Sequence, residues 1–112
     1  MSYVNDTQMS EIRFSDHVST LRLEDGLKYD AFVSIAVNEP KYIPRYSNIS
    51  KFIQSYKGMS CRPDCLVSEL FDWVVDQVGS CSHVSVTCTI HTDDNFKGTF
   101  VRELDFKRKK VM

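Results

Sequence analysis

Residues 30 to 37 read Asp30-Ala-Phe-Val-Ser-Ile-Ala-Val37, and this stretch decides the expected fold. Every second side chain is apolar, and these side chains are Ala31, Val33, Ile35 and Val37. The other face carries Phe32, Ser34 and Ala36. Such alternation is typical of a strand that buries one face. Asn38-Glu39-Pro40 ends the strand, because proline has no amide hydrogen to give to a sheet ladder.

Further strands are expected before and after this one in the sequence. Val18 to Leu23 predicts a first strand, and Asp25-Gly26 after it is a hairpin turn signal. Towards the C-terminus, the run from Val84 to Ile90 alternates in the same way, with Thr87 and Thr89 on its polar side. The sequence Asp93-Asp94-Asn95 predicts a turn, and Gly98 to Phe106 predicts the last strand.

Two helices are expected between the strand pairs. The first has an apolar stripe with helical spacing, formed by Ile49, Phe52, Ile53 and Tyr56. Ser47 is its expected N-cap, and Gly58 is its expected stop. The second helix begins at Pro63 with Asp64 in its first turn, and Gly79 closes it. Its apolar face is wide and consists of Leu66, Val67, Leu70, Phe71, Val74, Val75 and Val78.

The order strand–strand–helix–helix–strand–strand predicts an α+β domain with an antiparallel four-stranded sheet and both helices on one face. Phe32, Thr87 and Thr89 would lie on the other face. The two sheet edges need protection, and pairing with another subunit is one solution, so we expect a homo-oligomer. We expect residues 1–10 to be flexible, residues 11–106 to form the single domain, and residues 107–112 to form a basic tail.

Composition excludes several classes of protein. The net charge of −1 gives no global attraction to nucleic acid or membranes. No apolar run approaches the roughly 20 residues of a membrane span, and residues 1–10 are too polar for a signal peptide. The four cysteines could form two disulfides in a secreted protein. Without a secretion signal, we expect reduced thiols in the cytoplasm.

Several of these segments together resemble the tunnelling fold (T-fold), and most closely its QueF group. Asp30 to Pro40 is similar to a QueF strand that begins at a catalytic aspartate and ends at a proline. Phe52-Ile-Gln-Ser-Tyr56 is similar to the end of the family's first helix, and Pro63-Asp64-Cys65 stands where QueF has Glu-Asp-Cys. The resemblance runs from Asp30 to about Leu104.

The family includes GTP cyclohydrolase I, dihydroneopterin aldolase, the QueF nitrile reductases of queuosine synthesis and the QueF-like amidinotransferases. The resemblance implies barrels closed from several subunits. It also implies that a purine- or pterin-like ring, such as a 7-deazaguanine, binds at a subunit interface.

The sequence departs from the family at its reactive positions. QueF enzymes carry a nucleophilic cysteine seven residues before the aspartate, and that position is Leu23 here. The base-binding glutamate aligns with Pro63, and only a shift of one residue places Asp64 there. The family's NADPH-linked Glu-Ser-Lys-Ser segment is not reproduced in residues 45–50, and the zinc segment of GTP cyclohydrolase I is missing. We therefore expect no cofactor, no metal and no nitrile reductase activity.

Five residues are the candidates for a site. Asp30 and His91 suit proton transfer, and Cys65 at a helix start is the candidate nucleophile. Asp64, with Pro63 beside it, would accept hydrogen bonds from a guanine-like edge. Four of them also have an ordinary structural interpretation. Asp30 can be a strand-start carboxylate and His91 a surface histidine, while Cys65 can be a packed cysteine and Asp64 a helix N-terminal charge.

Other interpretations remain open. Cys61-x₃-Cys65 with His17, His83 or His91 could bind zinc. The cationic tail from Phe106 to Lys110 could contact nucleic acid. Most importantly, the loss of the reactive positions fits a non-catalytic interaction protein that reuses the fold.

Overall fold

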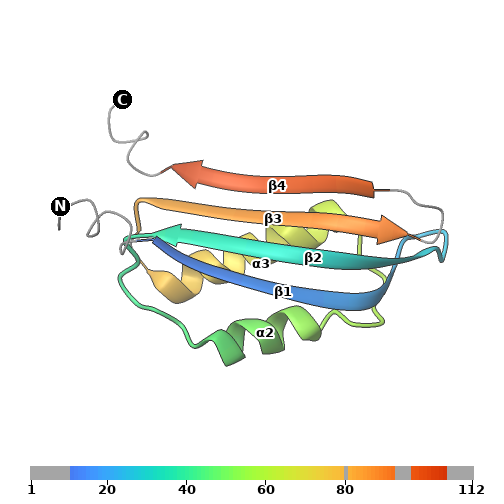
Figure 1. The fold of residues 1–112 in the computed structure, drawn as a ribbon, viewed down its shortest axis with the longest axis horizontal. Coiled ribbons are helices and arrows are strands. Elements are labelled where there is room, and N and C mark those ends of the chain that lie inside the picture. The colour runs from blue at the N-terminus through green and yellow to red at the C-terminus, as the bar shows by residue number, and fades with distance from the viewer. Residues whose placement is uncertain (1–10, 80, 93–96, 106–112) are drawn as a thin grey trace.

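The computed structural model describes residues 11–79, 81–92 and 97–105, and these form the expected element order. The elements, labelled as in Figure 1, are β1 (Glu11–Arg22), β2 (Lys28–Asn38), α2 (Tyr46–Gln54), α3 (Pro63–Val78), β3 (His83–Thr92) and β4 (Lys97–Asp105). The strands form one antiparallel sheet in the order β1-β2-β3-β4, and both helices cover the same face. The predicted α+β architecture is confirmed.

The first strand is longer than its sequence pattern indicates. Prediction placed it over residues 18–23, but β1 begins at Glu11 and ends at Arg22. Asp16 and His17 interrupt the apolar alternation, which concealed the first half of the strand. The strand ends at Arg22, and beyond it the Leu23 amide donates to the Leu27 carbonyl at 2.8 Å and closes the turn to β2.

The start and end of α2 also differ from the prediction. The helix begins at Tyr46 after Arg45, with no side-chain cap, so the assignment of Ser47 as N-cap is wrong. It ends at Gln54 rather than near Gly58, because tighter turns follow in which Tyr56 and Lys57 donate to carbonyls three residues back. The α3 prediction is confirmed from Pro63 to its close at Gly79, which has a φ of 71°.

A single apolar core fills the space between the sheet and the helices. The predicted inward set of β2 is buried, and so are Leu66, Leu70 and Val74 of α3. Ile49 and Ile53 bring α2 onto the same core, while Phe52 stacks on Trp73 of α3 at 4.5 Å between ring centroids. None of the described elements covers the other face of the sheet, and Phe32 there is 47% exposed.

Within the described part of the chain, neither helix is long and apolar enough to cross a membrane. The predictions for residues 1–10, for the turn at 93–95 and for the basic tail fall on residues outside the described ranges.

Candidate functional site

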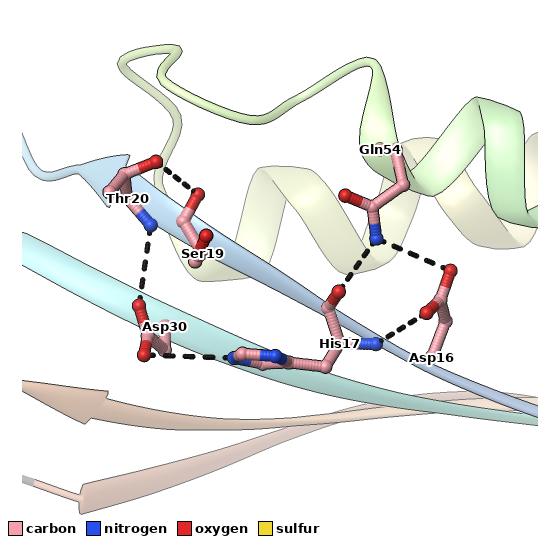
Figure 2. A network of polar contacts seen from close by, with 6 residues as sticks. All are labelled: Asp16, His17, Ser19, Thr20, Asp30 and Gln54. Carbon is pink, nitrogen blue, oxygen red and sulfur yellow. Dashed lines mark hydrogen bonds and ion pairs between the residues drawn. The ribbon is translucent and has the colours of Figure 1, made fainter.

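Asp30 and His91 lie side by side on the uncovered face of the sheet. They are register partners where β2 begins and β3 ends. The neighbours of Asp30, Tyr29 and Ala31, are buried on the helix side, so alternation directs the Asp30 side chain to the other face. Its Oδ1 accepts a hydrogen bond from the Thr20 amide at 3.3 Å, and its Oδ2 lies 3.6 Å from His17 Nε2 (Figure 2).

Aromatic rings connect this pair to the middle of the sheet. The His17 ring stacks on Phe32 with centroids 4.4 Å apart and an interplanar angle of 18°. Phe32 in turn meets His91 edge-on at 5.3 Å. A carboxylate, two imidazoles and an exposed phenyl ring therefore share one surface. This combination can hydrogen-bond the edge of a polar heterocycle, stack on its face and transfer protons.

Sequence reasoning missed the central place of His17. It considered His17 only as a zinc ligand, because the predicted first strand began after it. The clue was the spacing of β1, where Phe14 and Val18 are four residues apart and His17 falls on the opposite face.

A shallow groove of about 570 Å³ crosses the same face, and we call it the open-face groove. It is lined by Ser15, Asp16, His17, Phe32, Val33, Ser34, Thr87 and Thr89. Its hydroxyl groups can both donate and accept hydrogen bonds. Partial burial acts to raise the pKa of the Asp16 carboxyl, but hydrogen bonds from Ser50, the His17 amide and Gln54 outweigh it and lower that pKa.

The other predicted residues, Pro63, Asp64 and Cys65, lie at the start of α3 on the helix side of the sheet. This helix begins at the end of the sheet where β2 begins (Figure 1), and Asp30 is the third residue of β2. The segment before it follows the end of β1, since the Arg22 amide donates to the Met59 carbonyl and the Cys61 amide donates to the Arg22 carbonyl. The Tyr29 hydroxyl donates to the Cys61 carbonyl.

Asp64 is exposed and already paired. Arg62 binds it with two nitrogens, Nε at 3.2 Å from Oδ1 and a terminal nitrogen at 2.9 Å from Oδ2. Next to this pair is a small pocket of about 350 Å³, the helix-start pocket, which is lined by Leu23, Glu24, Asp25 and Arg62. Asp30 lines neither this pocket nor the open-face groove. Within one chain, the five candidate residues thus lie at the same end of the sheet. They form two groups, and these groups lie on opposite faces of the sheet.

The buried and partly buried thiols are poor replacements for the nucleophile that the resemblance places at position 23, which is Leu23 here. Cys61 lies beside that position, but burial, followed by nearby acidic groups, raises the pKa of its thiol to about 11. Burial raises the pKa of Cys88 to about 12 and also raises that of Cys81. A thiol with such a pKa is protonated at neutral pH and is a poor nucleophile. Cys65 is exposed, and all four cysteines are free.

The zinc interpretation gains no support. Among the described residues, no three His, Cys, Asp or Glu side chains gather in a way that could hold a metal ion. His83 starts β3 at the far end of the sheet, where it lies 2.8 Å from Glu103.

Comparison with known proteins supports the architecture. No protein-family model matches the sequence, and no curated protein matches it significantly. Among solved structures, the crystal structure of the archaeosine synthase QueF-Like in the apo form matches with a TM-score of 0.74 and 18% sequence identity. The match covers 84% of this chain and 92% of that chain. The chain therefore has the fold of the QueF-like archaeosine synthase, the tunnelling fold that its own sequence resembles.

Proposed function

We propose that this protein binds a purine- or pterin-like ring at a boundary between copies of the chain, without nitrile reductase chemistry. The observation that carries the proposal is the convergence of Asp30 and His91 with the start of α3 at one end of a QueF-like fold. In one chain the two groups lie on opposite faces of the sheet, so a site that uses both has to be completed by another copy.

The residues at this end of the sheet fit the chemistry of such a ring. Phe32 and His17 offer aromatic faces for stacking, and Asp30 offers a carboxylate at their edge. Asp64 would accept hydrogen bonds from the N–H groups of a guanine-like edge. Its bond to Arg62 is exposed, and such surface ion pairs are worth about 0–1 kcal/mol, so a ligand can displace Arg62 at little cost.

In any reaction at this site, Asp30 and His91 would transfer the protons. Nitrile reduction begins with a thiolate that attacks the nitrile carbon to form a thioimide. Leu23 cannot make that attack, and the nearby Cys61 is held as a thiol by its raised pKa. Cys65 is the exposed thiol at this end of the sheet, and it is the candidate nucleophile for any covalent step.

The test is a thermal-shift and calorimetric screen with guanine, 7-cyano-7-deazaguanine and a pterin. A ligand at 100 times its dissociation constant adds about 2.7 kcal/mol to the free energy of unfolding. We expect Asp64→Asn and Asp30→Asn each to weaken binding at least tenfold. The matched control is Asp72→Asn, an exposed carboxylate further along α3, which should leave binding unchanged. Absence of binding by all three compounds contradicts the proposal.

A second candidate function is a non-catalytic interaction protein. It is favoured by Leu23 at the nucleophile position and by the exposed apolar side chains of Tyr42 and Ile43, which are 61% and 65% exposed. In either case the four free cysteines support our proposal that the protein works in the reducing cytoplasm.

A further inference from the structure

The charges of this chain are unevenly distributed along its sequence. The stretch from Pro40 to Pro63 has five cationic side chains and no acidic one. The formal net charge of the whole chain is −1, so all other residues together carry −6. An overall charge near zero therefore conceals one strongly basic segment, which can attract an anionic surface locally.

Four of the five cations keep their charge available. The fifth, Arg62, is bound to Asp64 at 2.9 Å. In the described ranges, no acidic side chain lies within ion-pair distance of the other four, and each of them is exposed. They are Lys41, Arg45, Lys51 and Lys57, and we call residues 41–57 the basic segment.

The basic segment occupies one half of the helix side of the sheet. α2, which lies within this segment, packs against β1, whereas α3 packs against β3 and β4 (Figure 1). The charged side chains of α3 are all acidic, and they are Asp64, Glu69, Asp72 and Asp76. An anionic surface is therefore attracted to the α2 half and repelled by the α3 half, which gives the protein one preferred orientation on that surface.

An apolar tip projects near the start of the basic segment. Tyr42 and Ile43 are 61% and 65% exposed, and they stand between Lys41 and Arg45 in the sequence. The fold holds this tip from both sides. The Tyr42 amide donates to the Val78 carbonyl at the end of α3 at 3.0 Å, and the Arg45 carbonyl accepts hydrogen bonds from two amides in the first turn of α2. A fixed backbone thus presents both apolar side chains to solvent.

A membrane surface accounts for this combination of side chains. Lysine and arginine pair with anionic headgroups, while a tyrosine and an aliphatic side chain between them reach the boundary of the acyl chains. Protein interfaces instead place apolar anchors in pockets of the partner surface. Here the tip projects, and it lines neither the open-face groove nor the helix-start pocket.

The aromatic rings of the segment are less suited to single-stranded RNA, which stacks its bases on free ring faces. The Tyr46 ring stacks on Phe14 with centroids 6.1 Å apart, and its hydroxyl donates to a β1 carbonyl. The Tyr42 ring has the Lys41 ammonium group 5.7 Å from its centroid. Ile43, the most exposed large apolar side chain in the described ranges, has no ring for a base to stack on.

We propose that the basic segment docks this protein on an anionic membrane surface, with Tyr42 and Ile43 inserted among the lipid headgroups. The cytoplasmic leaflet of a membrane carries the required negative charge, and each Lys or Arg near it strengthens binding about fivefold, so four cations strengthen it roughly several-hundred-fold. The docking does not rest on the proposed ring-binding site, because Asp30 lies near the other end of β2. It is therefore measured without any ring ligand.

The first test is co-sedimentation of the full-length protein with lipid vesicles at about 0.1 M salt. One set of vesicles is pure phosphatidylcholine, and the other contains about one phosphatidylserine in three lipids. We expect binding to the anionic vesicles only, and its loss at about 1 M salt, which screens the charges. A single-stranded RNA and polyglutamate are offered as competitors, and neither should displace the protein from the vesicles.

Variants separate the charges from the apolar tip. Lys41→Gln combined with Arg45→Gln should weaken vesicle binding roughly 25-fold. Ile43→Ser should weaken it at least about fivefold, because the inserted apolar side chain is lost. The matched control is Lys28→Gln, which removes an exposed cation at the start of β2, outside the basic segment, and should leave binding unchanged.

The second test measures insertion directly and stays informative even if a charge variant misfolds. Ile43→Cys in a Cys65→Ser background, labelled with an environment-sensitive fluorophore, should shift its emission to the blue on anionic vesicles. The parent protein labelled at the exposed Cys65, at the other end of α3 from the tip, should not shift. No binding to anionic vesicles, equal binding to neutral ones, displacement by RNA or polyglutamate, or no spectral shift at position 43 would each overturn the inference.

Discussion

Replacement of Asp16 by asparagine tests how α2 is fixed to the sheet. The Asp16 carboxylate accepts hydrogen bonds from the Ser50 hydroxyl at 2.7 Å, from the His17 amide at 2.8 Å and from Gln54 Nε2 at 3.4 Å. An asparagine side chain at this position has the same size but no charge and one fewer acceptor oxygen. Hydrogen bonds to a charged group are roughly twice as strong as neutral ones, and a typical bond contributes about 1 kcal/mol.

Because the carboxylate is only partly buried and one of the three bonds is long, we expect Asp16→Asn to lower the free energy of unfolding by about 1–1.5 kcal/mol at pH 7. The loss should depend on pH. The pKa of Asp16 is lower in the folded protein than its usual value of 3.8, so its contribution is complete above that value. The contribution disappears as the pH falls through the folded-state pKa, where both proteins carry a neutral side chain.

The assay is urea denaturation at pH 7 and at several values down to pH 3, followed by circular dichroism. Asp76→Asn, which changes an exposed carboxylate on α3, is the matched control and should cost less than about 0.5 kcal/mol. An Asp16→Asn effect no larger than that of the control, or one that stays constant down to pH 3, would refute the assignment of Asp16 as the anionic link between β1 and α2.

Three further predictions follow from the core and the thiols. Leu70→Ala should lower the free energy of unfolding by about 2–5 kcal/mol in the same urea assay, because Leu70 is fully buried under the sheet. Alkylation at pH 7.5 followed by mass spectrometry should modify Cys65 well before Cys61 and Cys88, whose thiols have pKa values near 11 and 12; equal rates would contradict the burial of these thiols. With 7-cyano-7-deazaguanine and NADPH, we expect no loss of cofactor absorbance and no adduct mass, and turnover that Cys65→Ala abolishes would make Cys65 the nucleophile.

The architecture was predictable because individual segments carry strong sequence patterns. The alternation from Ala31 to Val37 and the broad apolar face of α3 each determine one element, and the order of elements then leaves few arrangements. The boundaries were less predictable. α2 starts without any side-chain cap, so the search for a capping residue selected Ser47 in error.

The candidate site was only partly predictable, for a physical reason. Strand register brings Asp30 to His91 across more than sixty positions of the chain, and no local pattern encodes that pairing. The role of His17 depended on the length of β1, which Asp16 concealed. A charged residue on the buried side of a strand looks like the end of that strand, unless the helix that supplies its hydrogen bonds is known.

Asp30 has a structural role and is also a candidate ligand-binding residue. Its bond to the Thr20 amide supports the bulge that ends β1, which is an ordinary structural role for a carboxylate at a strand start. Yet the same side chain is 47% exposed and lies near an imidazole, on the face where an aromatic ligand would stack. A carboxylate needed only for the bulge could be shielded from water, whereas a ligand-binding one has to stay accessible. The exposure of Asp30 leaves its carboxylate accessible to a ligand, as the proposed binding function requires.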